Sequence, residues 1–380
     1  MTRPVRTASL QVMQSGAKDG AVVIVKGQAA AVSVDDHALH RPCPVTKGHS
    51  MPLQILVPLH TYPDGNSANI ADHVAGVARH LKADVHGLVL NATFPRAASL
   101  MGNLLMNVDA MAQEVTAKSR LRGTALMAAM QAALDPIAIT FRSTQLDCVM
   151  GTIGSAAETY ARYHDLTVTG IGIDDLSMEA TAETVMFASG RPTLLVPQDL
   201  PPSRYQHVMI AWDGSRVATR AVADARDFLR LAKTVTIAVV TDEKILPVKN
   251  PALQLVEYLD LHNITAAVAL VEARQRPIAR VLQDHALVIG ADMMVMGAFG
   301  HSRMRDFVMG GATAGILRDL ELPVLLSLSP HLRVSVLIKA DTLNATPGFC
   351  LQGRRPRTPK EQPHANDARR HFRRTGPDCA

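Results

Sequence analysis

The stretch ADMMVMGAFGHSRMRDFVMGGATAGILRDLELPVLLS, residues 291–327, decides the fold of this chain. It predicts an apolar strand at its start, a glycine-marked loop, a helix and a second apolar strand. Glycines let backbone amides approach an anion closely, and the N-terminus of the following helix presents unpaired N–H groups. The stretch therefore predicts a strand–loop–helix–strand unit whose loop is suited to holding an anion.

The same alternation of apolar strands and amphipathic helices extends outward from this stretch. Expected strands cover 54–59, 85–90, 137–144, 166–170 and 193–196, and then 206–212, 235–240, 264–271, 292–297 and 322–328. Expected helices cover 68–81, 97–133, 155–164 and 178–188, and then 217–231, 251–261, 278–290 and 312–320. Buried strands that alternate with helices form parallel sheets with helices on both faces. The predicted fold class is α/β, with two doubly wound five-stranded parallel-sheet domains in tandem.

The order of elements repeats, which predicts the domain boundaries. We expect a disordered extension over 1–50, a first domain over 51–200, a second over 204–330, and a disordered basic tail over 331–380. Met51 stands directly before the first strong strand, so one hypothesis is that translation begins there.

Composition and charge exclude several classes of protein. No apolar run approaches the roughly 18 residues of a membrane span, and the N-terminus lacks a secretory signal, so a cytoplasmic protein is expected. The four cysteines are scattered without a CxxC pair, which predicts neither a zinc site nor a disulfide framework. The net charge of +5 arises from the two ends, because residues 1–50 hold 6 Lys/Arg against 3 acids and residues 331–380 hold 10 against 4. The rest is mildly acidic, so no specific nucleic-acid binding is expected.

With both halves laid out, the second resembles the universal stress protein family. Gly297, Gly300 and Gly310 have the family spacing G-x2-G-x9-G, and VMIAWDGS places Asp213 at the end of its first strand. The resemblance implies an adenine nucleotide alpha hydrolase-like fold that binds ATP, with or without Mg²⁺. The residues it implies for this site are Asp213, Val240, Gly297, Gly300, Gly310 and Gly311.

One position departs from the family pattern. The nucleotide-binding branch carries Ser or Thr after the third glycine, whereas this chain carries Gly311. Loss of one hydrogen bond to a charged phosphate costs about 1.5–3 kcal/mol, or roughly a ten- to hundredfold loss of affinity. Two structural alternatives stay open: the glycines serve a tight turn and close packing, and Asp213 serves as a turn residue in Asp-Gly-Ser.

The first half has a different loop at the corresponding place. It reads TGIGIDDLSMEATAE, with Asp174, Asp175, Glu179 and Glu183 where phosphates would approach, and its first strand ends at His60 instead of an aspartate. Clustered carboxylates repel a triphosphate. The first half is therefore predicted to be a degenerate packing partner. The acidic residues are either a solvated helix face or a divalent-cation site.

Three functions compete on this evidence. The first is a stress-response regulator that binds adenine nucleotide in its second half and acts through an unknown protein partner. The second is a scaffold or chaperone-like interaction protein without nucleotide. The third, an enzyme, lacks a P-loop, a nucleophile set or metal ligands, which leaves at most slow ATP hydrolysis.

The resemblance also bears on assembly. Family members pair through the last strand, which implies that 193–196 and 324–328 meet within one chain as an intramolecular pseudo-dimer. A homodimer of such chains is also compatible with it.

Overall fold

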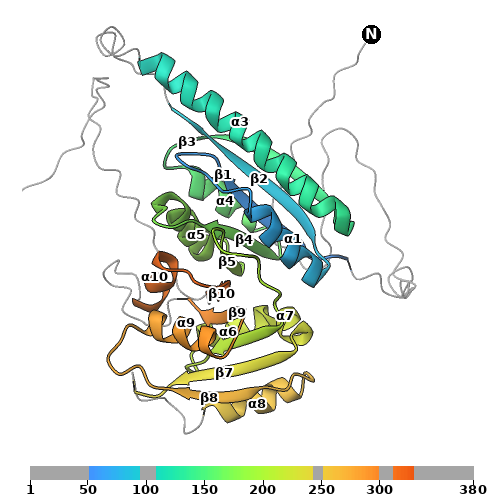
Figure 1. The fold of residues 1–380 in the computed structure, drawn as a ribbon, viewed down its shortest axis with the longest axis vertical. Helices are drawn as coiled ribbons and strands as arrows, with labels where there is room; N and C mark the ends of the chain where they lie inside the picture. Colours follow the sequence, from blue (N-terminus) through green and yellow to red (C-terminus); the bar gives the residue numbers. More distant parts are fainter. Residues whose placement is uncertain (1–50, 95–107, 243–250, 299–310, 329–380) are drawn as a thin grey trace, which may run out of the picture. The chain divides into compact units, whose positions relative to one another are not determined.

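The computed structural model describes residues 51–94, 108–242, 251–298 and 311–328 (Figure 1). The expectations for 1–50 and 331–380 lie outside the described residues. Among the described helices, none combines the length and the apolar character that a membrane span requires.

The first half alternates strands and helices in the expected order. Its elements are β1 (Gln54–His60), α1 (Ile70–Leu81), β2 (Asp84–Thr93), α3 (Val108–Leu134), the 3₁₀ turn η1 (Asp135–Ile137), β3 (Phe141–Val149), α4 (Ile153–Ala161), β4 (Leu166–Ile171), α5 (Leu176–Ala188) and β5 (Thr193–Pro197).

The second half repeats this order with shorter elements. They are β6 (His207–Ala211), α6 (Arg216–Asp224), α7 (Arg226–Leu231), β7 (Thr234–Val240), α8 (Pro251–Asp260), β8 (Ala267–Val271), α9 (Ile278–Val288), β9 (Met293–Gly297), α10 (Gly311–Arg318) and β10 (Val324–Ser327). The single helix expected over 217–231 is two helices, because the chain leaves helical geometry at Ala225.

The described strands form one ten-stranded sheet in the order β3-β2-β1-β4-β5-β10-β9-β6-β7-β8. Within each half the first strand lies between the second and the fourth, and all pairs within a half are parallel. Strand order therefore reverses between β1 and β4 and again between β6 and β9. The predicted fold class, tandem doubly wound α/β units, is confirmed.

The two halves join through their last strands. β5 and β10 pair antiparallel, with Leu195 opposite Val324, Leu194 opposite Leu325 and Thr193 opposite Leu326. All of these side chains are buried. The expected meeting of the two last strands within one chain is confirmed.

Side chains of each strand point alternately to two helical layers. In β1, Ile55, Val57 and Leu59 belong to the core cluster that also contains side chains of α1 and α3, whereas Leu56 belongs to a separate cluster with side chains of α4 and α5. Helix α1 is amphipathic, with Ile70, Val74 and other apolar residues on its buried face. Because helices cover both faces, only the loops at the strand ends are free to build a site.

The expectation for the third strand of the first half was wrong in its bounds. The sequence predicted it over 137–144, but Ile137 ends a 3₁₀ turn and Ala138 has a φ of 54°. The strand begins at Phe141, which lies opposite Val85, and continues to Val149. Pairing with the ten-residue β2 sets the length of β3, and this constraint is invisible in a local pattern.

Candidate functional site

Three of the residues expected to hold a ligand in the second half lie at the carboxyl ends of its strands. Asp213 follows β6, Gly297 ends β9, and Val240 ends β7. β6 is hydrogen-bonded to both β7 and β9, so these three residues share one edge of the sheet. Strand order reverses between β6 and β9, and open α/β sheets bind ligands outside such a reversal.

Asp213 begins the turn that leads into α6. Its carboxylate oxygen Oδ1 accepts a hydrogen bond from the Ser215 backbone N at 2.9 Å, and Gly214 between them has a φ of 72°. The Ser215 hydroxyl in turn accepts from the Ala218 N at 3.2 Å and caps the helix. The turn role considered for Asp213 is therefore present. Asp213 as a whole residue is half-buried.

Gly297 has a packing role. A Cβ at this position would lie 2.5 Å from the Ala218 N, 2.5 Å from the Val217 carbonyl carbon and 2.6 Å from Val217 Cγ2. The first turn of α6 therefore passes so close to the end of β9 that only glycine fits. The expectation of close packing holds at this glycine, and it leaves the backbone N–H groups at the start of α6 beside the strand end.

Gly311 occupies an open position. It is the first residue of α10, it is exposed, and an added Cβ would have no neighbour within 4 Å among the described residues. Thr313, two residues on, is buried and faces inward. Gly300 and Gly310, the other two glycines implied by the resemblance, lie outside the described residues.

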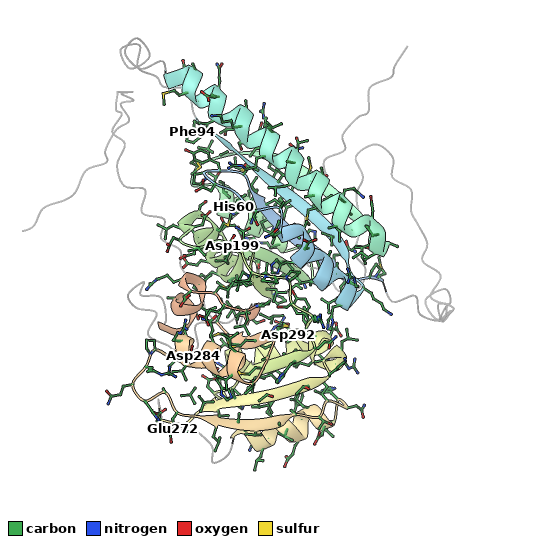
Figure 2. The ribbon with its side chains drawn as sticks, in the orientation of Figure 1. His60, Phe94, Asp199, Glu272, Asp284 and Asp292 are labelled. Carbon is green, nitrogen blue, oxygen red and sulfur yellow. The ribbon has the colours of Figure 1, made fainter. Side chains whose placement is uncertain are left out.

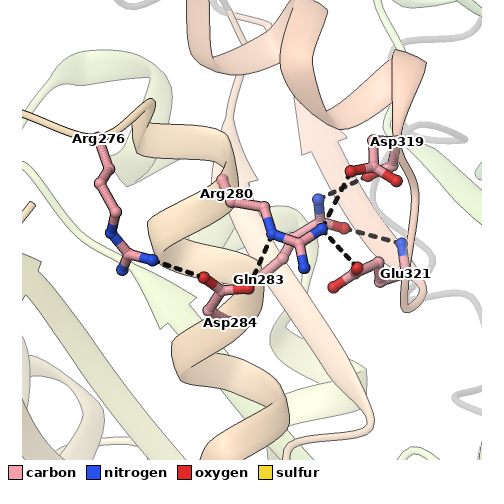
Figure 3. A network of polar contacts seen from close by, with 6 residues as sticks. All are labelled: Arg276, Arg280, Gln283, Asp284, Asp319 and Glu321. Carbon is pink, nitrogen blue, oxygen red and sulfur yellow. Dashed lines mark hydrogen bonds and ion pairs between the residues drawn. The ribbon is translucent and has the colours of Figure 1, made fainter.

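A polar network fixes the end of α10 against α9 (Figure 3). The Gln283 amide donates to the Asp319 carbonyl oxygen at 2.6 Å and accepts from the Glu321 N at 2.9 Å. Arg280 reaches Asp319 at 3.1 Å, Glu321 at 2.6 Å and Asp284 at 2.9 Å. Gln283 is 1% exposed, and both polar atoms of its amide are satisfied by these two hydrogen bonds. The network sets the position of the helix that follows the glycine loop.

Hydrogen bonds at the amino ends of the strands show which residues of the two halves correspond. The Gln54 N donates to Asp165 before β4, and the His207 N donates to Asp292 before β9. Counting forward from these equivalent residues, Gly170 of β4 corresponds to Gly297 of β9, and His60 of β1 corresponds to Asp213.

His60 cannot replace the carboxylate of Asp213. The side chain is 1% exposed, and neither ring nitrogen has a hydrogen-bond partner among the described residues. Burial lowers the pKa of His60 to about 4, against a smaller opposing effect of Asp175. His60, which is labelled in Figure 2, is therefore a neutral, buried imidazole at neutral pH.

Two amide side chains fill the space beside Gly170. The Asn66 Nδ2 donates to Gln198 Oε1 at 2.9 Å, and Asn66 Oδ1 accepts from the His60 N at 2.7 Å. A Cβ on Gly170 would lie 2.8 Å from the Asn66 Nδ2 and 3.1 Å from the Gln198 Oε1. In the second half, the backbone of α6 lies beside the corresponding glycine. The first half has thus closed the inner end of its cleft with its own side chains.

The outer part of that cleft, about 610 Å³, is acidic. Its lining comes from the loops after β1, β4 and β5 and includes Asp64, Asp174, Asp175 and Asp199. The sequence identified Asp174 and Asp175 but missed Asp64 and Asp199, which only the fold brings to the same edge.

Two of the acids expected at this cleft lie elsewhere. Glu179 and Glu183 stand along α5 and do not line the cleft. Burial raises the pKa of both, and Asp174 and Asp175 add to the rise at Glu179 while Arg318 opposes it. No group of three or more metal-ligating side chains is positioned for a cation among the residues that the structure describes.

A second cleft, about 850 Å³, lies next to Val240 and was not foreseen from the sequence. It is lined by Thr241, Leu270, Val271, Glu272, Arg274, Arg276 and His285. Its arginines are paired: Arg274 with Glu272 at 3.1 Å, and Arg276 with Asp284 at 2.8 Å. The cleft carries little unpaired positive charge.

The sheet order and the helices on both faces define a doubly wound α/β protein whose two halves repeat one fold. Residues 204–327 match the model of the Universal stress protein family. The C-terminal part of the chain is therefore a universal stress protein domain.

Individual relatives agree with this assignment. Universal stress protein Slr1230 of Synechocystis sp. (strain ATCC 27184 / PCC 6803 / Kazusa) is 43% identical over 56 residues, which cover 15% of this chain and 18% of that protein. A universal stress protein from Archaeoglobus fulgidus DSM 4304 has a TM-score of 0.56 at 16% identity, covering 73% of this chain and 96% of that one, and shows the shared fold. A universal stress protein solved in complex with cAMP is 18% identical over 32% of this chain and 95% of its own, with a TM-score of 0.25.

Proposed function

We propose that the chain is a stress-response regulator whose second half binds an adenine nucleotide, ATP, and whose first half is a packing partner without this site. The proposed division is 51–200 for the degenerate domain and 204–330 for the binding domain, with 1–50 and 331–380 as extensions. The proposed compartment is the cytoplasm, and the proposed output is altered binding of a protein partner.

The observation that carries the proposal is the position of Asp213 and Gly297. Asp213 follows β6 and Gly297 ends β9, and the sheet order reverses between these two strands. Asp213 is acidic, and Gly297 allows a close backbone approach. In the proposed site Asp213 faces the nucleoside end and Val240 the base. The backbone of Gly297, Gly300, Gly310 and Gly311 and the N-terminus of α10 face the phosphates.

The difference between the halves supports a single site. His60 replaces the aspartate, Asn66 and Gln198 close the cleft floor, and four carboxylates line what remains. A triphosphate carries several negative charges and would be repelled there. We therefore expect one nucleotide per chain.

The test uses the full chain. The purified protein is denatured and any released nucleotide is identified by mass spectrometry, and the nucleotide-free protein is then titrated with ATP, with and without Mg²⁺, by calorimetry. The expected result is one site per chain that Asp213→Ala weakens at least about tenfold, because a hydrogen bond to a charged group is lost. Asp64→Ala, at the acidic cleft, is the matched control and should leave the affinity unchanged. Absence of both bound nucleotide and measurable affinity would exclude the proposal.

One alternative has specific support. A scaffold without nucleotide is favoured by Gly311 at the usual Ser/Thr position and by the packing contact that already accounts for Gly297. In that case the chain acts through its surfaces alone, as a single chain or as a homodimer. A negative result in both nucleotide assays, together with an unchanged fold, would support this alternative.

A further inference from the structure

Two buried histidines meet at the amino ends of the strands of the first half. His86 Nδ1 lies 3.1 Å from His164 Nε2, and His86 Nε2 lies 2.9 Å from the Thr144 hydroxyl. Arg142 Nη2 lies 3.0 Å from the same His164 nitrogen. His86 is on β2, Thr144 and Arg142 are on β3, and His164 connects α4 to β4. The cluster therefore ties three elements together.

The contacts fix the proton positions. His164 Nδ1 lies 2.8 Å from the Tyr160 carbonyl oxygen, which only accepts, so Nδ1 carries the hydrogen. In a neutral ring Nε2 is then an acceptor, which suits the donating guanidinium of Arg142 and requires His86 Nδ1 to donate as well. His86 Nε2 is left to accept from the Thr144 hydroxyl. In this arrangement both imidazoles are neutral, and His164 Nε2 accepts from both His86 and Arg142.

The charges around the pair oppose protonation. Burial lowers the pKa of His86 to about 4, with Arg142 and His164 as further causes. Burial also lowers the pKa of His164. Its hydrogen bond to the backbone and nearby Asp165 act in the opposite direction, while Arg142 and Arg191 lower the pKa further. The two arginines thus outweigh the single neighbouring carboxylate.

A proton added to either ring would change the arrangement. On His164 it would occupy Nε2, so that the N–H of Arg142 would lose its acceptor and His86 Nδ1 would have to accept instead of donate. On His86 it would occupy Nε2 and donate to the Thr144 hydroxyl, which would change from donor to acceptor. In both cases a buried cation would stand beside Arg142.

We propose that the His86–His164 pair is an acid-sensitive latch, which holds β3 and the end of α4 against β2 while neutral and opens there when protonated. β3 is the outermost strand of the first half, so it can separate without disturbing the joint between β5 and β10. Local opening of this kind costs less than global unfolding.

The direction of the pH dependence follows from the lowered pKa values. The open state binds protons more readily than the closed state, so acid favours opening. The latch is at full strength above the ordinary histidine value of 6.5 and weakens as the pH falls toward about 4, the value for His86.

Hydrogen exchange of the full chain, read by mass spectrometry, tests the latch. Peptides that cover β3 are followed from about pH 7.5 to about pH 4.5, and rates are divided by the intrinsic chemical rate at each pH. We expect protection in β3 to fall by at least about tenfold, since one released histidine contributes up to a factor of ten per pH unit. Peptides from β6 and β7 should keep their protection. An equal fall in both halves would mean global unfolding and would overturn the latch.

Variants separate the latch from a merely structural contact. His86→Gln keeps a donor and an acceptor but cannot titrate, so the pH dependence of β3 protection should flatten. Arg142→Gln, at an exposed residue, removes the positive charge that opposes protonation of the two histidines. It should therefore flatten the pH dependence of β3 protection in part. Burial also lowers the pKa of His285, a histidine of the second half. His285→Gln is the control and should leave the pH dependence of β3 protection unchanged. If His86→Gln fails to fold at neutral pH, Arg142→Gln decides. A profile identical to that of the wild type in the decisive variant would exclude the proposal.

Discussion

His60 of β1 and Asp213 after β6 occupy the same position in the two halves of the sheet. Each stands six residues beyond the strand residue whose amide N donates to an aspartate, Asp165 in one half and Asp292 in the other. One position thus carries a buried neutral imidazole in the first half and a half-exposed carboxylate in the second. The two copies of the fold therefore differ at the centre of their ligand edge.

His60→Leu should leave stability at pH 7 unchanged or raise it slightly. Both ring nitrogens of His60 lack a partner, so the substitution removes no described side-chain hydrogen bond and removes the cost of burying polar atoms. His60→Asp would bury a carboxylate without a basic partner and should cost about 3 kcal/mol or more. Urea unfolding at pH 7 measures both.

The same residue predicts a pH effect. Because the folded pKa of His60 is lowered to about 4, its unfavourable contribution to stability grows as the pH falls from 6.5 toward 4. In His60→Leu this part of the acid destabilisation should vanish. If the variant and the wild type lose stability equally in acid, the lowered pKa of His60 is contradicted.

Gly311→Ser should strengthen ATP binding by roughly ten- to hundredfold, because it restores a hydroxyl at the first residue of α10. In the part of the chain that the structure describes, no atom lies within 4 Å of an added Cβ. Gly311→Ala adds the same carbon without the hydroxyl and serves as the control. Calorimetric titration compares the three proteins, and equal affinities would show that this position does not contact the phosphates.

Gly297→Ala and Gly311→Ala should have opposite effects on stability. At Gly297 the new Cβ would lie 2.5 Å from backbone atoms of α6, and the resulting displacement should cost about 1–3 kcal/mol. At the helical, open Gly311 alanine should stabilise by roughly 0.4–1 kcal/mol. Chemical denaturation measures the free energy of unfolding of both variants. If Gly297→Ala leaves the stability unchanged, α6 does not pack against β9 as described.

Gln283→Leu should destabilise the second half by about 2–4 kcal/mol. It leaves the Asp319 carbonyl and the Glu321 N without their partner in a buried place, at about 1–3 kcal/mol for each group. Arg280→Met is the comparison, because ion pairs of an exposed side chain should contribute less than the hydrogen bonds of the buried Gln283. A larger loss in Arg280→Met than in Gln283→Leu would reverse the ranking proposed for this network.

The joint between the halves predicts coupled unfolding. Leu194 and Leu325 face each other across the antiparallel pair, and both are fully buried. Each Leu→Ala change should cost about 2–5 kcal/mol, and the double mutant should depart from additivity by about 0.5 kcal/mol or more. Thermal unfolding of the single and double variants measures the coupling. Strict additivity would show that the two strands contribute independently.

Most of the architecture could be predicted from the sequence, because apolar periodicity and glycine positions are local signals. The order of strands and helices, the class of the fold and the strand-end position of Asp213 and Gly297 follow from such patterns. The bounds of β3 could not be predicted, because its length depends on pairing with β2, far away along the chain.

The candidate sites divide in the same way. The sequence by itself determined that the second half carries the glycine spacing and the aspartate, and that the first half lacks an aspartate at the end of its first strand. Only the tertiary structure decided that His60 replaces Asp213, that Asn66 and Gln198 close the first cleft, and that α6 requires glycine at 297. The physical reason is that packing and hydrogen bonding join residues distant in sequence, and their contacts leave no periodic trace in the chain.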